Sequence, residues 1–140
     1  MAAFDLGRFK EAQAQSWPAA LAELRAGRKQ SHWMWFIFPQ LAGLGSSPMA
    51  VRYAIGSAEE ARAYLSDPVL GARLREGVVA MLAHQGQGAE TILGGIDALK
   101  FRSSLTLFAA VADEPALFAE ALDAFYDGVR DERTLELLAR

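Results

Sequence analysis

The chain has 140 residues, 52% of them hydrophobic, and a formal net charge of -3 at pH 7. This length and composition favour a single globular domain over residues 1–140 with a substantial buried core. A weakly acidic chain lacks the basic surface with which proteins hold phosphate backbones, so we expect no nucleic acid partner. With no cysteine and only two histidines, the sequence predicts no disulfide and no metal site, and it indicates no cofactor.

The sequence also indicates where the protein resides. The first residues of the chain include the charged residues Asp5, Arg8 and Lys10. This segment therefore lacks the apolar core of a signal peptide. The longest weakly charged stretch, residues 103–112, is too short to span a bilayer. The absence of cysteine suits a reducing compartment. We therefore expect a cytoplasmic protein that has no membrane partner.

Helix punctuation predicts two consecutive helices at the start of the chain. Asp5 is expected to cap the first of them. Ser16 is expected to cap a second helix over residues 17–26, with Pro18 in its opening turn and Gly27 just beyond its end. Together the two segments predict an αα pair.

An aromatic segment follows, with the sequence SHWMWFIFPQ at residues 31–40. Ser31 is expected to cap a short helix beginning at His32, and Pro39 disfavours helical geometry at the residue before it. The next segment, GLGSSP, contains two glycines and ends with Ser47 in position to cap another short helix. The apolar residues of the first short helix cover its whole circumference, so no face is left for water.

The second half of the chain predicts further helices around one central helix. Residues 97–112 are apolar on nearly every face from Leu105 onward, which is typical of a helix buried on all sides. Side-chain caps for the remaining helices are expected at Ser57, Asp67, Asp113 and Asp131. Because apolar and polar residues almost never alternate with a period of two, the sequence gives little indication of strands. The sequence therefore predicts an all-α fold of about six to eight mostly short helices.

Several runs carry a family resemblance that covers nearly the whole chain. They are RF at residues 8–9, AQ at 12–13, AGRKQSHWMWFIFPQLAGLGSSPMA at 26–50, YAIGS at 53–57, EARAYL at 60–65, DPVLGARL at 67–74 and LKFRSSLTLF at 99–108. They closely resemble a small bacterial all-helical family known as domain of unknown function 1810. The chain departs from the family pattern at Asp67, where the family has a histidine.

The resemblance implies a compact helical fold in the bacterial cytosol but no established activity. Members are often labelled calpastatin, a label that does not suit this chain, because an inhibitor that folds only on its target should be polar and disordered. The chain is also distantly similar to NADAR-type helical domains associated with ADP-ribose chemistry. This second similarity implies a nucleotide-derived ligand.

One constellation of residues suits a small ligand that carries phosphate. His32 and Gln40 are the candidate catalytic residues, because an imidazole can transfer protons near neutral pH and an amide can orient a water molecule or a carbonyl. Aromatic faces could stack on a planar base, while glycine-loop N–H groups and lysine could hold phosphate. The candidate ligand-binding residues are Trp33, Trp35, Gly43, Gly45, Ser47, Tyr53, Lys100, Arg102 and Ser103.

Each of these residues also has a structural interpretation. The aromatic turn and Tyr53 could be part of the core, and Lys100 and Arg102 could be solvated charges. His84 suits a favourable charge at the carbonyl end of its helix. Two functions remain open on the sequence: a domain that binds or processes a phosphorylated or nucleotide-derived small molecule, and a non-catalytic module for protein interaction or homodimerisation. Whether the protein is an enzyme also remains open.

Overall fold

The computed structural model describes residues 4–140, and in that part of the chain it contains helices and two isolated bridges but no strand. The helices are α1 (Gly7–Ala26), α2 (Met34–Ile37), α3 (Pro48–Arg52), α4 (Ala58–Ser66), α5 (Leu70–Leu82), α6 (Ala89–Leu93), α7 (Gly95–Val111), α8 (Ala116–Tyr126) and α9 (Glu132–Leu138). The all-α prediction is confirmed. The described residues form more helices than the six to eight expected, because short helices such as α6, which lies between Gly88 and Gly94, add to the number.

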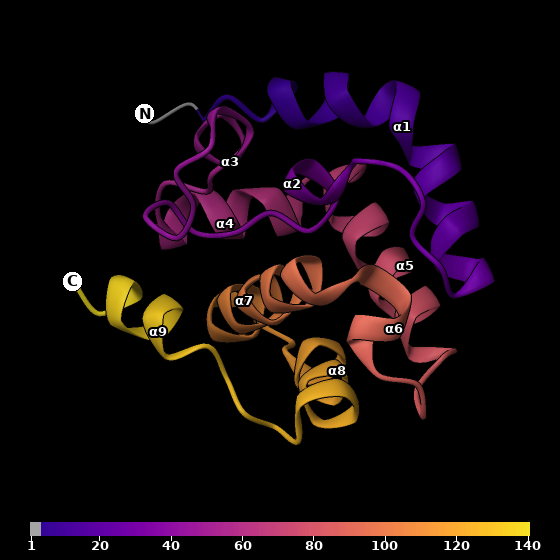
Figure 1. Ribbon diagram of the computed structural model, residues 1–140. Coiled ribbons are helices and arrows are strands. Elements are labelled where there is room, and N and C mark those ends of the chain that lie inside the picture. Colours follow the sequence, from indigo (N-terminus) through magenta and orange to yellow (C-terminus); the bar gives the residue numbers. More distant parts are fainter. Residues whose placement is uncertain (1–3) are drawn as a thin grey trace.

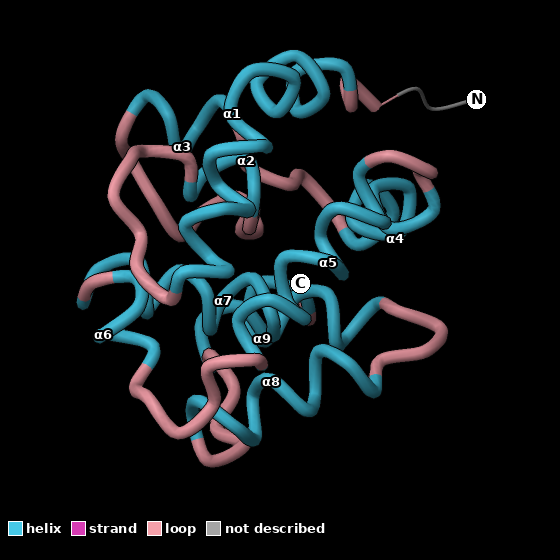
Figure 2. Tube along the Cα trace, turned by 90° about the vertical axis from the view of Figure 1, so that its right-hand side faces the viewer, coloured by secondary structure: helices cyan, strands magenta, loops and turns pink. Residues whose placement is uncertain are grey.

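Helix α7 is the centre of the fold, as predicted for residues 97–112. It packs against α4, α6, α8 and α9, and Figures 1 and 2 show α1 and α8 on opposite sides of it. Phe101, Leu105 and Phe108 on this helix are buried. Only its first turns reach the surface with large apolar side chains, because Ile96 and Leu99 are exposed. Burial of most of its circumference explains the absence of a polar face in this part of the sequence.

The predicted αα pair at the start of the chain is wrong, because α1 is one continuous helix of 20 residues. Its buried residues Phe9, Gln13, Ala20 and Leu24 keep helical spacing on both sides of Pro18. Pro18 lies on the exposed side, where the carbonyl group that loses its backbone partner can face water. Ser16 therefore lies inside the helix and is not a cap. Asp5 is not a cap either, because Leu6 is at the cap position and no side chain accepts a hydrogen bond there.

The other predicted caps divide into confirmed and corrected ones. Side chains accept hydrogen bonds from the opening turns of α3, α4, α5 and α9, and they belong to Ser47, Ser57, Asp67 and Asp131 respectively. Asp113 does not cap α8: Pro115 is the residue at the cap position, and no side chain accepts a hydrogen bond there. A proline at this position supplies a suitable φ without a side-chain acceptor.

His84 lies beside the end of a different helix from the one that carries it. Its Nε2 lies 2.9 Å from the carbonyl oxygen of Arg25, in the last turn of α1. Gly27, which has a φ of 75° at the end of α1, leaves room for the imidazole ring, since a Cβ there would lie 3.0 Å from it. The sequence interpretation of His84 as a group at a carbonyl end therefore applies to α1 rather than to its own helix.

Helix α9 is joined to the rest by an extended connection that begins with two residues of positive φ, Asp127 and Gly128. The backbone N–H of Asp131 donates to Thr106 Oγ1 on α7 at 2.9 Å. Leu137 faces Gly43, so the helix covers part of the loop that follows the aromatic segment. No helix of residues 4–140 combines the length and apolar character needed to cross a lipid bilayer.

Candidate functional site

A single carboxylate holds the loop that leads into the aromatic segment. Glu23 Oε1 accepts hydrogen bonds from the backbone N–H groups of Gln30 (2.7 Å) and Ser31 (2.9 Å) and from the indole N–H of Trp33 (3.0 Å). Glu23 Oε2 accepts one from the hydroxyl of Ser31 at 2.6 Å. The predicted cap at Ser31 is therefore wrong, because this hydroxyl is bound to α1 and α2 begins only at Met34.

The same hydrogen bonds change the acidity of this carboxyl group. Partial desolvation acts to raise the pKa of Glu23, but the four hydrogen bonds, beginning with that from the Ser31 hydroxyl, outweigh it and lower the pKa from 4.5 to about 2. The side chain is therefore an anion at neutral pH. A charged acceptor makes stronger hydrogen bonds than a neutral one, so the loop is firmly fixed to α1.

Most of the aromatic segment belongs to the core. Trp33, Phe36 and Phe38 are buried. The ring of Phe38 packs on Phe101 with 4.7 Å between ring centroids, and Gly77 on α5 leaves room for it. Trp35 is only half-buried, so its ring is the one that remains partly accessible. A place in the core is therefore sufficient to explain Trp33, Phe36 and Phe38, but not Trp35.

Two lysines and an aspartate join the aromatic segment to the start of α7. Asp97 Oδ2 lies 3.0 Å from Lys29 Nζ, and Asp97 Oδ1 lies 3.8 Å from Lys100 Nζ. Each ammonium group also lies over an indole ring, Lys29 over Trp33 (5.0 Å) and Lys100 over Trp35 (5.3 Å). We call these five residues the lysine cluster. Its two cations and one anion leave a net positive charge.

A shallow depression of about 340 Å³ adjoins this cluster at the N-terminus of α7, with Asp97 in its lining. Gly94 has a φ of 90°, and a Cβ on Gly94 or on Gly95 would meet nothing within 4 Å. The first backbone N–H groups of α7, up to that of Asp97, have no acceptor within residues 4–140. Free N–H groups at a helix start, next to lysines and an accessible indole, can bind an anion and a planar ring.

The structure places the sequence-predicted residues in three different regions. Trp33, Trp35 and Lys100 belong to the lysine cluster, and His32 precedes Trp33 in the chain, with an exposed side chain that makes no hydrogen bond within residues 4–140. The second region contains Gln40, Gly43, Gly45, Ser47 and Tyr53, between α2 and α4. The third contains Arg102 and Ser103.

The second region serves local structure. The carbonyl oxygen of Gln40 accepts a hydrogen bond from Ile55, and Ser47 caps α3. Tyr53 is buried, and its ring packs on Phe9 and Phe36. Figure 1 shows α3 beside the start of α1, whereas α6, which leads into the start of α7, lies towards the other end of α1. These residues are therefore not brought together with Lys100.

Arg102 lies on the other side of α7 from Lys100, because residues two apart on a helix are rotated by about 200°. Arg102 Nη2 donates to the carbonyl oxygen of Arg130 at 3.3 Å, while its Nε is buried without a partner within residues 4–140. Ser103 Oγ donates to the carbonyl oxygen of Leu99 one turn earlier. Both therefore bond to nearby backbone rather than to the lysine cluster.

Sequence reasoning did not select Glu23, Lys29, Asp97 or the pair Gly94–Gly95. Two signals were available: a glycine pair immediately before a long helix, and a lysine close before the aromatic segment. Neither indicates that the residues meet, because Lys29 and Asp97 are far apart in the sequence. Within residues 4–140, no group of three histidine, aspartate or glutamate side chains is placed to hold a metal ion.

Comparison with known proteins gives a family and a solved relative. Residues 3–138 match the family model described as "Protein of unknown function (DUF1810)". The crystal structure of the conserved hypothetical protein Rv1873 from Mycobacterium tuberculosis is 52% identical in sequence, with a TM-score of 0.96 and 98% of each chain covered. No curated protein matches. The helical architecture and nearly the whole sequence thus agree with one family, and the chain belongs to DUF1810.

Proposed function

We propose that the lysine cluster and the first turn of α7 bind a small phosphorylated molecule with a planar base, such as an ADP-ribose-like nucleotide derivative. The observation that carries this proposal is the position of Lys100, beside free helix N–H groups and over a half-buried indole. Phosphate would accept hydrogen bonds from the N–H groups, and the base would stack on Trp35.

The two lysines have different roles in this proposal. Lys29 Nζ is close to Asp97 (3.0 Å), and the lysine side chain is 9% exposed, so it fixes the position of the carboxylate. Lys100 Nζ is farther from Asp97 (3.8 Å), and its side chain is 24% exposed. Lys100 can therefore turn from Asp97 towards a phosphate at little cost, since partly exposed ion pairs contribute little stability.

A step of proton transfer would fall to His32. Its ring is exposed and has no hydrogen bond within residues 4–140, and His32 directly precedes Trp33 of the cluster. Gln40, the other candidate catalytic residue, lies in the region between α2 and α4 and is not part of this proposal. Our proposal is therefore that this site binds the ligand. If the ligand is also processed, His32 is the residue that would transfer the proton.

The test is a thermal-shift and calorimetric titration with AMP, ADP-ribose, adenosine and inorganic phosphate. A ligand that binds only the native state raises its stability, by about 2.7 kcal/mol at a concentration of 100 Kd. We expect AMP and ADP-ribose to raise the melting temperature more than adenosine or phosphate alone, because only they offer both chemical groups.

The matched variants are Lys100→Gln and Lys10→Gln, since each removes one ion-paired lysine, and Lys10 pairs with Asp67 away from the cluster. Lys100→Gln should weaken AMP binding by about tenfold, the usual worth of one charged hydrogen bond. Lys10→Gln should leave it unchanged. Equal affinities of the two variants, or no shift with any of the four compounds, would contradict the proposal.

The alternative is a homodimerisation module, and it draws support from two side chains next to the depression. Ile96 is 73% exposed and Leu99 is 66% exposed, which is unusual for large apolar residues on a central helix. Sedimentation equilibrium distinguishes the two functions. A mass that doubles with concentration, and returns to that of the monomer in Leu99→Ser, would favour the dimer.

A further inference from the structure

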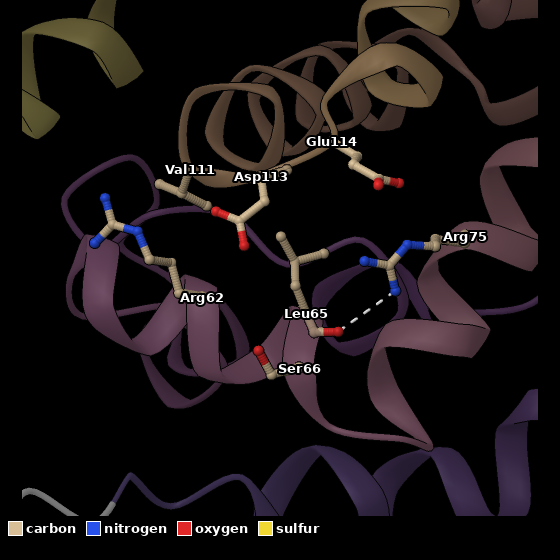
Figure 3. A pocket seen from close by; sticks show the side chains of 8 residues that line it. Arg62, Leu65, Ser66, Arg75, Val111, Asp113 and Glu114 are labelled. Carbon is tan, nitrogen blue, oxygen red and sulfur yellow. Dashed lines mark hydrogen bonds between the residues drawn. The ribbon is translucent and has the colours of Figure 1, made fainter.

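A second hollow, of about 430 Å³, lies on another part of the molecule, between the ends of α4 and α7 and the side of α5. Figure 3 shows its residues: Arg62 and Ser66 come from α4, Arg75 from α5, and Asp113 and Glu114 from the connection between α7 and α8. It shares no residue with the lysine cluster. We call it the charged groove.

The groove presents opposite charges that do not pair with one another. The arginines Arg62 and Arg75 line one side, and the carboxylates of Asp113 and Glu114 line the other. Within residues 4–140, none of the four makes a salt bridge within 4.0 Å. Their charges are therefore available to a ligand that carries both signs.

The arginine side is weakly occupied by the protein itself. Arg75 Nη1 donates to the carbonyl oxygen of Leu65 at 3.4 Å, a long hydrogen bond that leaves most of its donors free. Figure 3 shows this guanidinium turned towards the hollow and the hydroxyl of Ser66 pointing into it. A planar guanidinium in this position suits a carboxylate.

The opposite side suits a positive group. Helix α7 ends at Val111, so the negative end of its dipole lies beside Asp113 and Glu114. Figure 3 shows the carboxylate of Asp113 pointing into the space above Leu65. An ammonium group placed there would meet a carboxylate and a helix C-terminus together.

We propose that the charged groove binds a free amino acid, with its carboxylate on Arg75 and its ammonium on Asp113. Leu65, Val111 and Ala112 form the apolar part of the lining, which suits a short aliphatic side chain. The volume is within the range of small-molecule sites. This proposal is independent of the phosphate site.

The experiment uses L-leucine and two analogues that each lack one charge, isopentylamine and 4-methylpentanoate. Binding is measured by calorimetry and by amide shifts in two-dimensional NMR at millimolar ligand. We expect saturable binding of leucine, with shifts at residues 62–66 and 111–114, and binding at least about tenfold weaker for each analogue, since each loses a charged contact.

Three variants locate the site. Arg75→Gln and Asp113→Asn should each weaken leucine binding by about tenfold. Arg133→Gln, which removes an exposed arginine that pairs with Glu136 on α9, should leave it unchanged. The melting temperature of each variant verifies its fold. Absence of saturable leucine binding, equal binding of isopentylamine, or equal losses in all three variants would overturn the proposal.

Discussion

Gln13 is a buried polar residue that joins three parts of the core. Its Nε2 donates to the carbonyl oxygen of Phe36 at 2.6 Å and to the hydroxyl of Tyr64 at 3.1 Å. Burial raises the pKa of Tyr64, which keeps this hydroxyl protonated. One amide thus links α1 to the aromatic segment and to α4, and the carbonyl group of Phe36 depends on it for a partner.

Gln13→Leu should therefore destabilise the protein by about 1–3 kcal/mol, because it leaves a buried carbonyl oxygen without a donor. Urea unfolding followed by circular dichroism measures the change. Gln15→Leu is the matched control, since Gln15 is exposed on the same helix, and it should change stability by less than about 0.5 kcal/mol. Equal effects of the two substitutions would show that the hydrogen bonds of Gln13 contribute nothing measurable.

Glu23 predicts a dependence of stability on pH. Because its pKa is lowered from 4.5 to about 2 in the folded protein, its contribution is complete above pH 4.5 and is lost as the pH falls through about 2. The free energy of unfolding of the wild-type protein should fall more steeply between these pH values than that of Glu23→Gln. Urea unfolding across this range measures both slopes, with Glu11→Gln, an exposed glutamate of α1, as control. Parallel slopes would argue against the hydrogen-bonded anion.

At the scale of single residues, the sequence predicts those roles that depend on near neighbours. Ser47 and Asp131 are caps because their acceptors lie three residues from the donors. Ser31 has the same local pattern but bonds to Glu23 in the preceding helix. The carboxylate of Glu23 binds this hydroxyl more strongly than a backbone N–H of α2 would, because a charged carboxylate accepts from the hydroxyl and from two backbone N–H groups together. A local pattern cannot indicate such a competitor.

At the scale of helices, a glycine determines how closely α4 and α5 approach. Gly71 is in the first turn of α5, and a Cβ there would overlap the carbonyl oxygen of Leu65 at the end of α4. The bend between the two helices therefore requires a residue without a side chain. The same approach brings Arg75 to Leu65 and so shapes the charged groove.

Gly71→Ala should destabilise the protein by about 1–3 kcal/mol through overpacking, although alanine has the higher helix propensity. Gly95→Ala is the contrasting change, since a Cβ there meets nothing within 4 Å, and it should be neutral or slightly stabilising. Thermal unfolding of the two variants gives the comparison. A Gly71→Ala protein as stable as Gly95→Ala would mean that α4 and α5 can separate without cost.

Helix α1 shows why the bounds of a helix are harder to predict than its presence. Proline is favoured in the first turn of a helix, and that rule places the start of a second helix at residue 17, just before Pro18. The buried stripe of α1 nevertheless continues from Gln13 to Ala20. Burial of this stripe against α5 outweighs the lost hydrogen bond. This packing energy depends on the tertiary structure, so a local sequence pattern does not indicate it.

At the scale of the whole molecule, stability depends on the packing around α7. Phe108 is fully buried and contacts rings from two other helices, Tyr64 at 5.5 Å and Phe118 at 6.0 Å between centroids. Phe108→Ala should cost about 3–5 kcal/mol, the usual range for a buried phenylalanine. Urea unfolding measures it against Phe125→Ala, a half-buried residue whose loss should cost less. A cost for Phe108→Ala below about 1 kcal/mol would contradict the central position of α7.

The fold and the candidate site differ in how far the sequence predicts them. Helical periodicity and apolar content predict the all-α class and the central helix, because both depend on contiguous residues. The lysine cluster instead joins the loop after α1 to the start of α7, and the backbone N–H of Lys29 also donates to the carbonyl oxygen of Ile92 on α6. Whether these segments come together depends on how the helices pack. The sequence pattern therefore indicates the aromatic half of the site but does not identify Lys29 and Asp97 as part of it.

The attachment of α9 has a consequence for local unfolding. Among its side chains only Thr134 is buried, Leu137 and Leu138 are half-buried against the core, and the backbone N–H of Asp131 donates to Thr106 Oγ1 on α7. A unit with so few buried contacts opens at a free energy well below that of global unfolding. Amide protons of α9 should accordingly exchange with solvent while those of α7 stay protected. Each opening event would briefly uncover Gly43, which Leu137 otherwise covers.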